Sequence, residues 1–150
     1  QFDSRFHAVI SPGLQEFAEA TLLFHYLEGT GDLKPWREFH SYMGDGIEFP
    51  LVDYLLGLAD LTGELMRVAT NSAAGHDNVQ IRRETAAQVS NFMSRVTDQC
   101  MVLGSRFGST GNNLGSHRAV LGSSFAEKIE TMRTSLEKVQ LIVYRYILQD

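Results

Sequence analysis

Several features that mark common protein classes are scarce in this sequence. Its 150 residues include one cysteine, Cys100, which forms no disulfide within the chain and stands in an apolar stretch. Such a cysteine is typical of a buried, unreactive thiol in a reducing compartment. No apolar run approaches the roughly 18 residues of a membrane-spanning helix. The charged start QFDSRFH also lacks the apolar region of a secretory signal. These absences predict a cytosolic or nuclear protein without a membrane segment.

Positive charge is scarce as well. The chain has 13 Lys and Arg against 18 Asp and Glu, which gives a formal net charge of −5. Proteins that bind nucleic acid on their own usually carry a basic surface, because much of their affinity comes from neutralising phosphates. Here Arg82-Arg83 is the only adjacent basic pair. If the chain acts on RNA, we expect a partner to supply much of the positive field.

Strand-type alternation of apolar and polar residues is missing, and helical periodicity is present instead. Four helical segments are predicted, at about residues 3–28, 50–73, 80–103 and 124–149. Glycine and proline gather between the first two segments, which predicts a loop at residues 29–49 with a short helix near Trp36. We interpret Trp36 as an anchor of that loop in the core. The fold class predicted is all-α.

The first helical segment contains Ser11-Pro12, for which two interpretations are open. Serine and proline together are typical of a helix start, as N-cap and first residue. The same proline can instead produce a kink inside one longer helix. In either case the chain is predicted to form a single helical domain over residues 1–150, and its start at Gln1 inside patterned sequence suggests a truncated N-terminus.

Acidic residues occur on the first predicted helix among apolar neighbours. Glu16 and Glu19 are three residues apart and therefore share one face. A helix that is apolar on most of its circumference is usually enclosed by other elements. Two enclosed like charges need a cation, or one of them must keep its proton. His7 and His25 flank this pair, and we interpret them as hydrogen-bonded structural histidines.

A second acidic pattern lies on the helix predicted after Pro50. Its polar residues and one glycine follow a 4-3-4-3 spacing and so form one narrow stripe on a mostly apolar helix: Asp53, Gly57, Asp60, Glu64 and Arg67. Asp60 and Glu64 project side by side, because they are one helical turn apart. This helix therefore carries a second pair of neighbouring carboxylates.

Two interpretations of these carboxylates follow from spacing alone. In one, they bind a hard cation such as Mg²⁺ or Mn²⁺, which takes carboxylate oxygens and water. In the other, which spacing alone favours, they are solvated stripes of a bundle and Arg67 neutralises one pair. A di-iron bundle is excluded, because it needs Glu-x-x-His motifs that these two helices lack.

These residues also carry a resemblance to a known family. The segment PLVDYLLGLADLTGELMR at 50–67 resembles the hallmark segment of the translin-associated factor X (TRAX) branch of the translin family. The segment RFHAVISPGLQEFAEA at 5–20 is similar to the motif that precedes it in that branch. Weaker similarity continues at 88–100 and 134–146. The resemblance therefore covers most of the chain, although the helices that precede RFHAVI in the family are absent.

The resemblance implies a fold, a partner and an activity. The fold implied is the antiparallel helical bundle of the translin family, which assembles with translin into a closed hetero-octamer. That complex is an endoribonuclease on single-stranded RNA, implicated in clearing passenger strands of small RNAs and in trimming tRNA-precursor fragments. The alternative is a non-catalytic scaffold that stabilises translin and mediates nucleic-acid or protein binding.

The family's catalytic carboxylates match acidic residues of this chain one by one. Its LQExxE motif corresponds to Glu16 and Glu19, and its ADLTGE motif corresponds to Asp60 and Glu64. The resemblance thus implies Glu16, Glu19 and Asp60 as catalytic residues that hold Mg²⁺ or Mn²⁺, with Glu64 as a further ligand or supporting residue. An ion held there would activate water and neutralise the scissile phosphate. With the resemblance, the cation hypothesis replaces the solvated stripes as the preferred interpretation.

Overall fold

The computed structural model describes four stretches of the chain, residues 4–30, 32–75, 78–108 and 116–148. Within these stretches the regular structure is helical and contains no strand, so the all-α prediction is confirmed. The chain divides into two compact units, residues 1–61 and 62–150, and helix α2 contributes residues to both.

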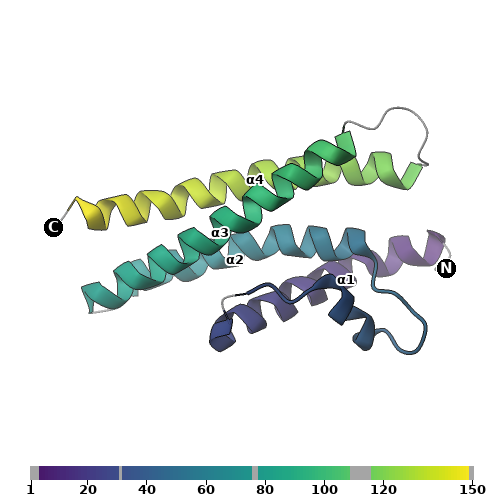
Figure 1. The fold of residues 1–150 in the computed structure, drawn as a ribbon, viewed down its shortest axis with the longest axis horizontal. Coiled ribbons are helices and arrows are strands. Elements are labelled where there is room, and N and C mark those ends of the chain that lie inside the picture. The colour runs from purple at the N-terminus through teal and green to yellow at the C-terminus, as the bar shows by residue number, and fades with distance from the viewer. Residues whose placement is uncertain (1–3, 31, 76–77, 109–115, 149–150) are drawn as a thin grey trace. The chain divides into compact units, whose positions relative to one another are not determined.

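The first unit begins with helix α1, Ser4–His25, which has Pro12 in its interior (Figure 1). Of the two interpretations of Ser11-Pro12, one longer helix is therefore the correct one. A π-helical turn, Tyr26–Thr30, continues α1, and Gly29 in it has a φ of 83°. Because side chains disfavour this left-handed conformation, glycine suits the end of the helical run.

The segment that follows α1 packs through aromatic side chains. A 3₁₀ helix, Trp36–Tyr42, forms at the predicted place. Phe39 and Phe49 are fully buried, with ring centroids 5.2 Å apart. The Trp36 indole N–H donates to the carbonyl oxygen of Phe49 at 2.8 Å, and the Phe49 amide donates to Nδ1 of His40 at 3.0 Å. Trp36 and His40 thus hold both polar groups of the Phe49 backbone, as expected of an anchor.

The second unit contains the end of helix α2 (Leu51–Gly75), helix α3 (Val79–Gly108) and helix α4 (Ser116–Ile147). Helices α3 and α4 lie side by side and run in opposite directions, as the antiparallel bundle prediction requires (Figure 1). Helix α4 begins at Ser116, eight residues before the predicted start. The glycine and serine residues of that stretch predicted a loop, but local propensity is a weak guide to where a helix begins.

The core of the second unit is built from α3 and α4. Its most buried side chains include Met93, Val96 and Cys100 of α3 and Phe125, Met132 and Val139 of α4. Burial raises the pKa of the Cys100 thiol to about 11, which confirms the prediction of a buried thiol and makes the reactive thiolate scarce. Among the described helices, none combines the length and apolar character needed to cross a bilayer.

Candidate functional site

In the first unit, the predicted polar stripe on α2 contacts α1 at Gly57. A Cβ atom placed on Gly57 would lie 2.6 Å from the carbonyl oxygen of Gln15, 2.8 Å from Cβ of Ala18 and 3.0 Å from the amide nitrogen of Glu19. Two of these three atoms belong to the α1 backbone, which cannot move aside cheaply. Only glycine at position 57 allows the two helices to approach this closely.

One turn earlier, Asp53 places a carboxylate inside the same contact. Asp53 is fully buried. Its Oδ1 atom accepts hydrogen bonds from the Ser11 hydroxyl at 2.5 Å and from the Gln15 amide at 3.2 Å. Its second oxygen lies 2.8 Å from Nε2 of His7. His7 is therefore the hydrogen-bonded structural histidine that we predicted. We call the surface where the two helices meet the contact face. It consists of His7, Ser11, Gln15 and Ala18 on α1 and of Asp53 and Gly57 on α2. Its end at Asp53 is polar.

Asp53 was not among the predicted site residues, although the sequence contains a signal for it. A polar residue recurs every four positions at His7, Ser11 and Gln15, so these side chains form one polar row on α1. That row matches the single buried carboxylate at the start of the stripe on α2. Only the two patterns together indicate a buried polar contact, because a polar row on one helix alone is also typical of a solvated face.

The contact face sets the direction of α1 relative to the start of α2. Residues 7–15 meet Asp53, whereas residues 15–19 meet Gly57, so residue numbers rise together along both helices. These two helices therefore run in the same direction in the first unit (Figure 1). The antiparallel arrangement expected for the whole bundle does not hold here, because residues 26–50 lead the chain back to the level at which α1 began.

The contact face also places three predicted site residues in the first unit. The Glu19 backbone lies against Gly57, and Asp60 follows Gly57 by one turn on the same face of α2. Glu19 and Asp60 are both half-buried, whereas Glu16 is exposed. The structure thus brings the Glu19 segment to the face that carries Asp60 and leaves the Glu16 side chain toward solvent.

Glu64 belongs to the second unit and has a cationic partner. Its Oε1 lies 2.8 Å from a guanidinium nitrogen of Arg67, whose side chain is exposed. This pair is the neutralisation that the solvated-stripe interpretation anticipated. Within the described residues, no three His, Cys, Asp or Glu side chains are grouped so as to hold a metal ion. The four-carboxylate metal site stays a prediction, and its donor set, oxygen atoms only, is of the type that Mg²⁺ and Mn²⁺ prefer.

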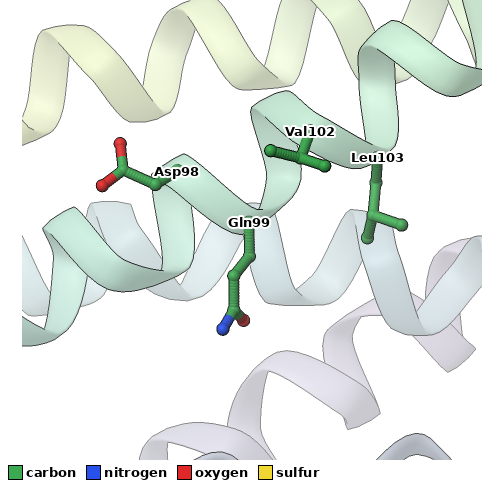
Figure 2. Close-up of a pocket in the computed structure, with 4 residues that line it drawn as sticks. All are labelled: Asp98, Gln99, Val102 and Leu103. Atoms are coloured by element: carbon green, nitrogen blue, oxygen red, sulfur yellow. The ribbon is translucent and has the colours of Figure 1, made fainter.

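Two hollows lie elsewhere in the described residues. One lies on α3 and is lined by Asp98, Gln99, Val102 and Leu103 (Figure 2). It contains one carboxylate and no histidine, cysteine or hydroxyl that could act as its partner in acid–base or nucleophilic chemistry. The other lies in the first unit. It is lined by residues at the end of the 3₁₀ helix and in the loop that follows, which include His40, Asp45 and Glu48. Neither contains a predicted site residue.

Comparison with known proteins agrees with the all-α fold. The model of the Translin family matches residues 2–150. Translin-associated protein X from Rattus norvegicus and from Mus musculus are each 30% identical over 164 residues, covering 93% of this chain and 50% of each relative. The Translin-associated protein X homolog of Schizosaccharomyces pombe is 27% identical over 146 residues, covering 97% of this chain and 54% of that relative.

The chain spans about half the length of the curated relatives it matches. The family model, in contrast, covers nearly all of its residues, including both helices of the contact face and all four predicted carboxylates. The chain belongs to the translin family.

Proposed function

We propose that this chain is the catalytic part of a divalent-metal-dependent endoribonuclease that acts on single-stranded RNA together with translin. Its similarity to proteins named Translin-associated protein X supports the partnership with translin. The net charge of −5 supports the need for a partner, because the chain offers little positive charge of its own to the RNA backbone.

The observation that carries the catalytic proposal is the close approach at Gly57. It sets the Glu19 backbone against the face of α2 on which Asp60 follows one turn later. The Glu19 and Asp60 positions, on different helices, therefore lie in one region of the first unit, at a contact that tolerates no side chain at position 57. Bundle enzymes build metal sites in this way, from acidic side chains on facing helices.

In this proposal Glu16, Glu19 and Asp60 hold Mg²⁺ or Mn²⁺, and Glu64 supports them. A bound ion supplies an activated water and neutralises charge that develops on the scissile phosphate. Glu19 and Asp60, being half-buried, have less competition from bulk water than surface carboxylates. Glu16 is exposed, which leaves it free to turn toward the ion or the RNA.

A second candidate function is a non-catalytic scaffold for translin. The pairing of Glu64 with Arg67 favours it, because a carboxylate neutralised by arginine is less available to a cation. The absence of three grouped ligands among the described residues favours it too. The two functions differ in one measurable respect, metal-dependent cleavage.

The test assembles the chain with translin and measures cleavage of single-stranded RNA with Mg²⁺ and with a chelator. Asp60→Asn keeps the size of the side chain and removes its charge, so cleavage should fall by about 100-fold. The melting temperature should stay the same or rise, because the change removes one of the like charges that the proposal places around the ion. Glu19→Gln should behave in the same way.

Glu130→Gln is the matched control, since it removes an exposed carboxylate that is paired with Arg133 in the second unit. It should leave both cleavage and melting temperature unchanged. Full cleavage by Asp60→Asn would refute the catalytic proposal and favour the scaffold. A large loss of stability in Asp60→Asn would show instead that this carboxylate has a structural role.

A further inference from the structure

The buried carboxylate of Asp53 is the group of the first unit that the proposed function does not use. It is fully buried, and it receives hydrogen bonds from two α1 residues, Ser11 and Gln15, and pairs with His7. A second hydrogen bond, from the Gln15 amide to the Ser11 hydroxyl at 2.9 Å, links two of these partners to each other. All of these donors come from one face of α1.

These bonds define the register of α1 on α2 more sharply than apolar contacts can. Hydrogen bonds weaken steeply outside a narrow range of distance and angle. Sliding α1 by one turn, about 5.4 Å, would separate Asp53 from its partners and leave a buried carboxylate without donors. An apolar contact, such as that of Ala18 at Gly57, would lose far less, since dispersion is non-directional.

The same register governs where the predicted carboxylates lie. Ser11 precedes Glu19 by eight residues, and Asp53 precedes Asp60 by seven. Both separations are close to two helical turns, or about 11 Å along each axis. A displacement of α1 at Asp53 is therefore carried along the rigid helices to the level of Glu19 and Asp60.

We infer that Asp53 is a positioning residue of the proposed metal site: its bonds to Ser11, Gln15 and His7 set the register in which the Glu19 segment faces Asp60. This inference rests on the proposed function, but the register itself can be measured without metal. Asp53 lies two turns from the carboxylates and makes no contact with the ion or the RNA in this scheme. Buried polar groups are known to specify register between helices in this manner.

The first measurement is a distance between α1 and α2 in the metal-free, full 150-residue chain. Spin labels are attached at Ala20 and Leu51, which are exposed residues of α1 and α2 within the first unit, in a Cys100→Ala background. Double electron–electron resonance then reports the distance distribution. Asp53→Asn and Ser11→Ala should each shift or broaden it relative to the unsubstituted labelled chain.

The second measurement is the affinity for Mn²⁺, followed through the resonance of the free ion. Loss of a residue that orients metal ligands typically weakens binding by about 10-fold or more. We expect such a loss in Asp53→Asn and a smaller one in Ser11→Ala, at temperatures where circular dichroism shows both to be folded. Ser11→Ala keeps the buried carboxylate and its other donors, so it stays informative if Asp53→Asn fails to fold.

Val139→Ala is the matched control, because it destabilises the chain at a fully buried position of α4, in the second unit. It should lower the melting temperature and leave both the distance distribution and the Mn²⁺ affinity unchanged. If the distance distribution of Asp53→Asn and Ser11→Ala equals that of the unsubstituted chain, the register inference is overturned. Wild-type Mn²⁺ affinity in both variants would overturn the positioning role.

The two proposals fail in different ways. If the distances shift but the unsubstituted chain binds no Mn²⁺, or binds it equally well after Glu19→Gln, the metal site is refuted and Asp53 has no ligand set to position. If Mn²⁺ binding depends on Glu19 but not on Asp53, the proposed function stands and this inference falls.

Discussion

The glycine at the contact face offers a sharp test, because the structure predicts opposite effects for the same substitution at two positions of one helix. Replacing glycine by alanine inside a helix normally stabilises a protein by about 0.5–1 kcal/mol. At Gly63 a Cβ would meet no atom of the described residues within 4 Å, so Gly63→Ala should show that gain. At Gly57 the same Cβ would lie 2.6 Å from the Gln15 carbonyl oxygen.

The loss expected in Gly57→Ala can be estimated from the contacts. The 2.6 Å separation must lengthen to at least 3.4 Å for ordinary van der Waals contact, and two of the obstructing atoms are backbone. Overpacking of this kind costs about 1–3 kcal/mol. Moving α1 away also stretches the bonds to Asp53, each worth about 1 kcal/mol. After the helical gain is subtracted, Gly57→Ala should destabilise the first unit by about 2 kcal/mol.

Urea titration followed by tryptophan fluorescence measures this loss, because the single tryptophan, Trp36, lies in the first unit. Circular dichroism follows Gly63→Ala in parallel. A third variant, Gly104→Ala, calibrates the argument: among the described residues its Cβ would meet the flexible end of Ile129 at 2.7 Å, so it should cost little. If Gly57→Ala is as stable as the unsubstituted chain, the close approach of α1 and α2, and everything built on it, is wrong.

Two further predictions concern the thiol and the RNA. Because the Cys100 pKa is raised from 9.0 to about 11, its burial contributes about 3 kcal/mol to stability below pH 9. Unfolding releases the proton above pH 9, so that contribution is lost as the pH rises toward 11. The stability difference between the unsubstituted chain and Cys100→Ala should shrink accordingly in urea titrations at pH 8.5 and 11, and a constant difference would contradict the burial. Single-stranded RNA should bind the isolated chain weakly at about 0.15 M salt and more weakly still as salt increases; tight, salt-insensitive binding in a filter assay would refute the need for a partner.

Much of the fold follows from periodicity and composition. The helix predicted at 50–73 is found at Leu51–Gly75, and the 3₁₀ helix at Trp36 lies where proline and glycine predicted a loop with one short helix. Helix ends are harder to predict, because local propensity is a weak guide to where a helix begins, as at the start of α4. The direction of α1 relative to α2 depends on pairing between distant residues, which a pattern within one helix does not contain.

The sequence proposes the residues of the candidate site but does not contain their arrangement. The spacing predicted that Glu16, Glu19, Asp60 and Glu64 lie on two helices and that Arg67 can neutralise a carboxylate of the stripe, yet it did not show that Glu16 is exposed. Asp53 is the clearest case of missing information. Its spacing matched the stripe, but its burial depends on donors 38 to 46 residues away in the chain.

The residues that set the helix register and the carboxylates proposed as ligands are different residues of α1. The residues that set the helix register are His7, Ser11 and Gln15, whereas the proposed ligands on that helix are Glu16 and Glu19. A chain could therefore exchange its acidic residues for neutral ones and still assemble the same pair of helices. The residues that specify the helix packing and the residues that supply the proposed chemistry can therefore change independently of each other. A protein that keeps the first set of residues but not the second would share this fold as a structural partner, without the proposed nuclease chemistry.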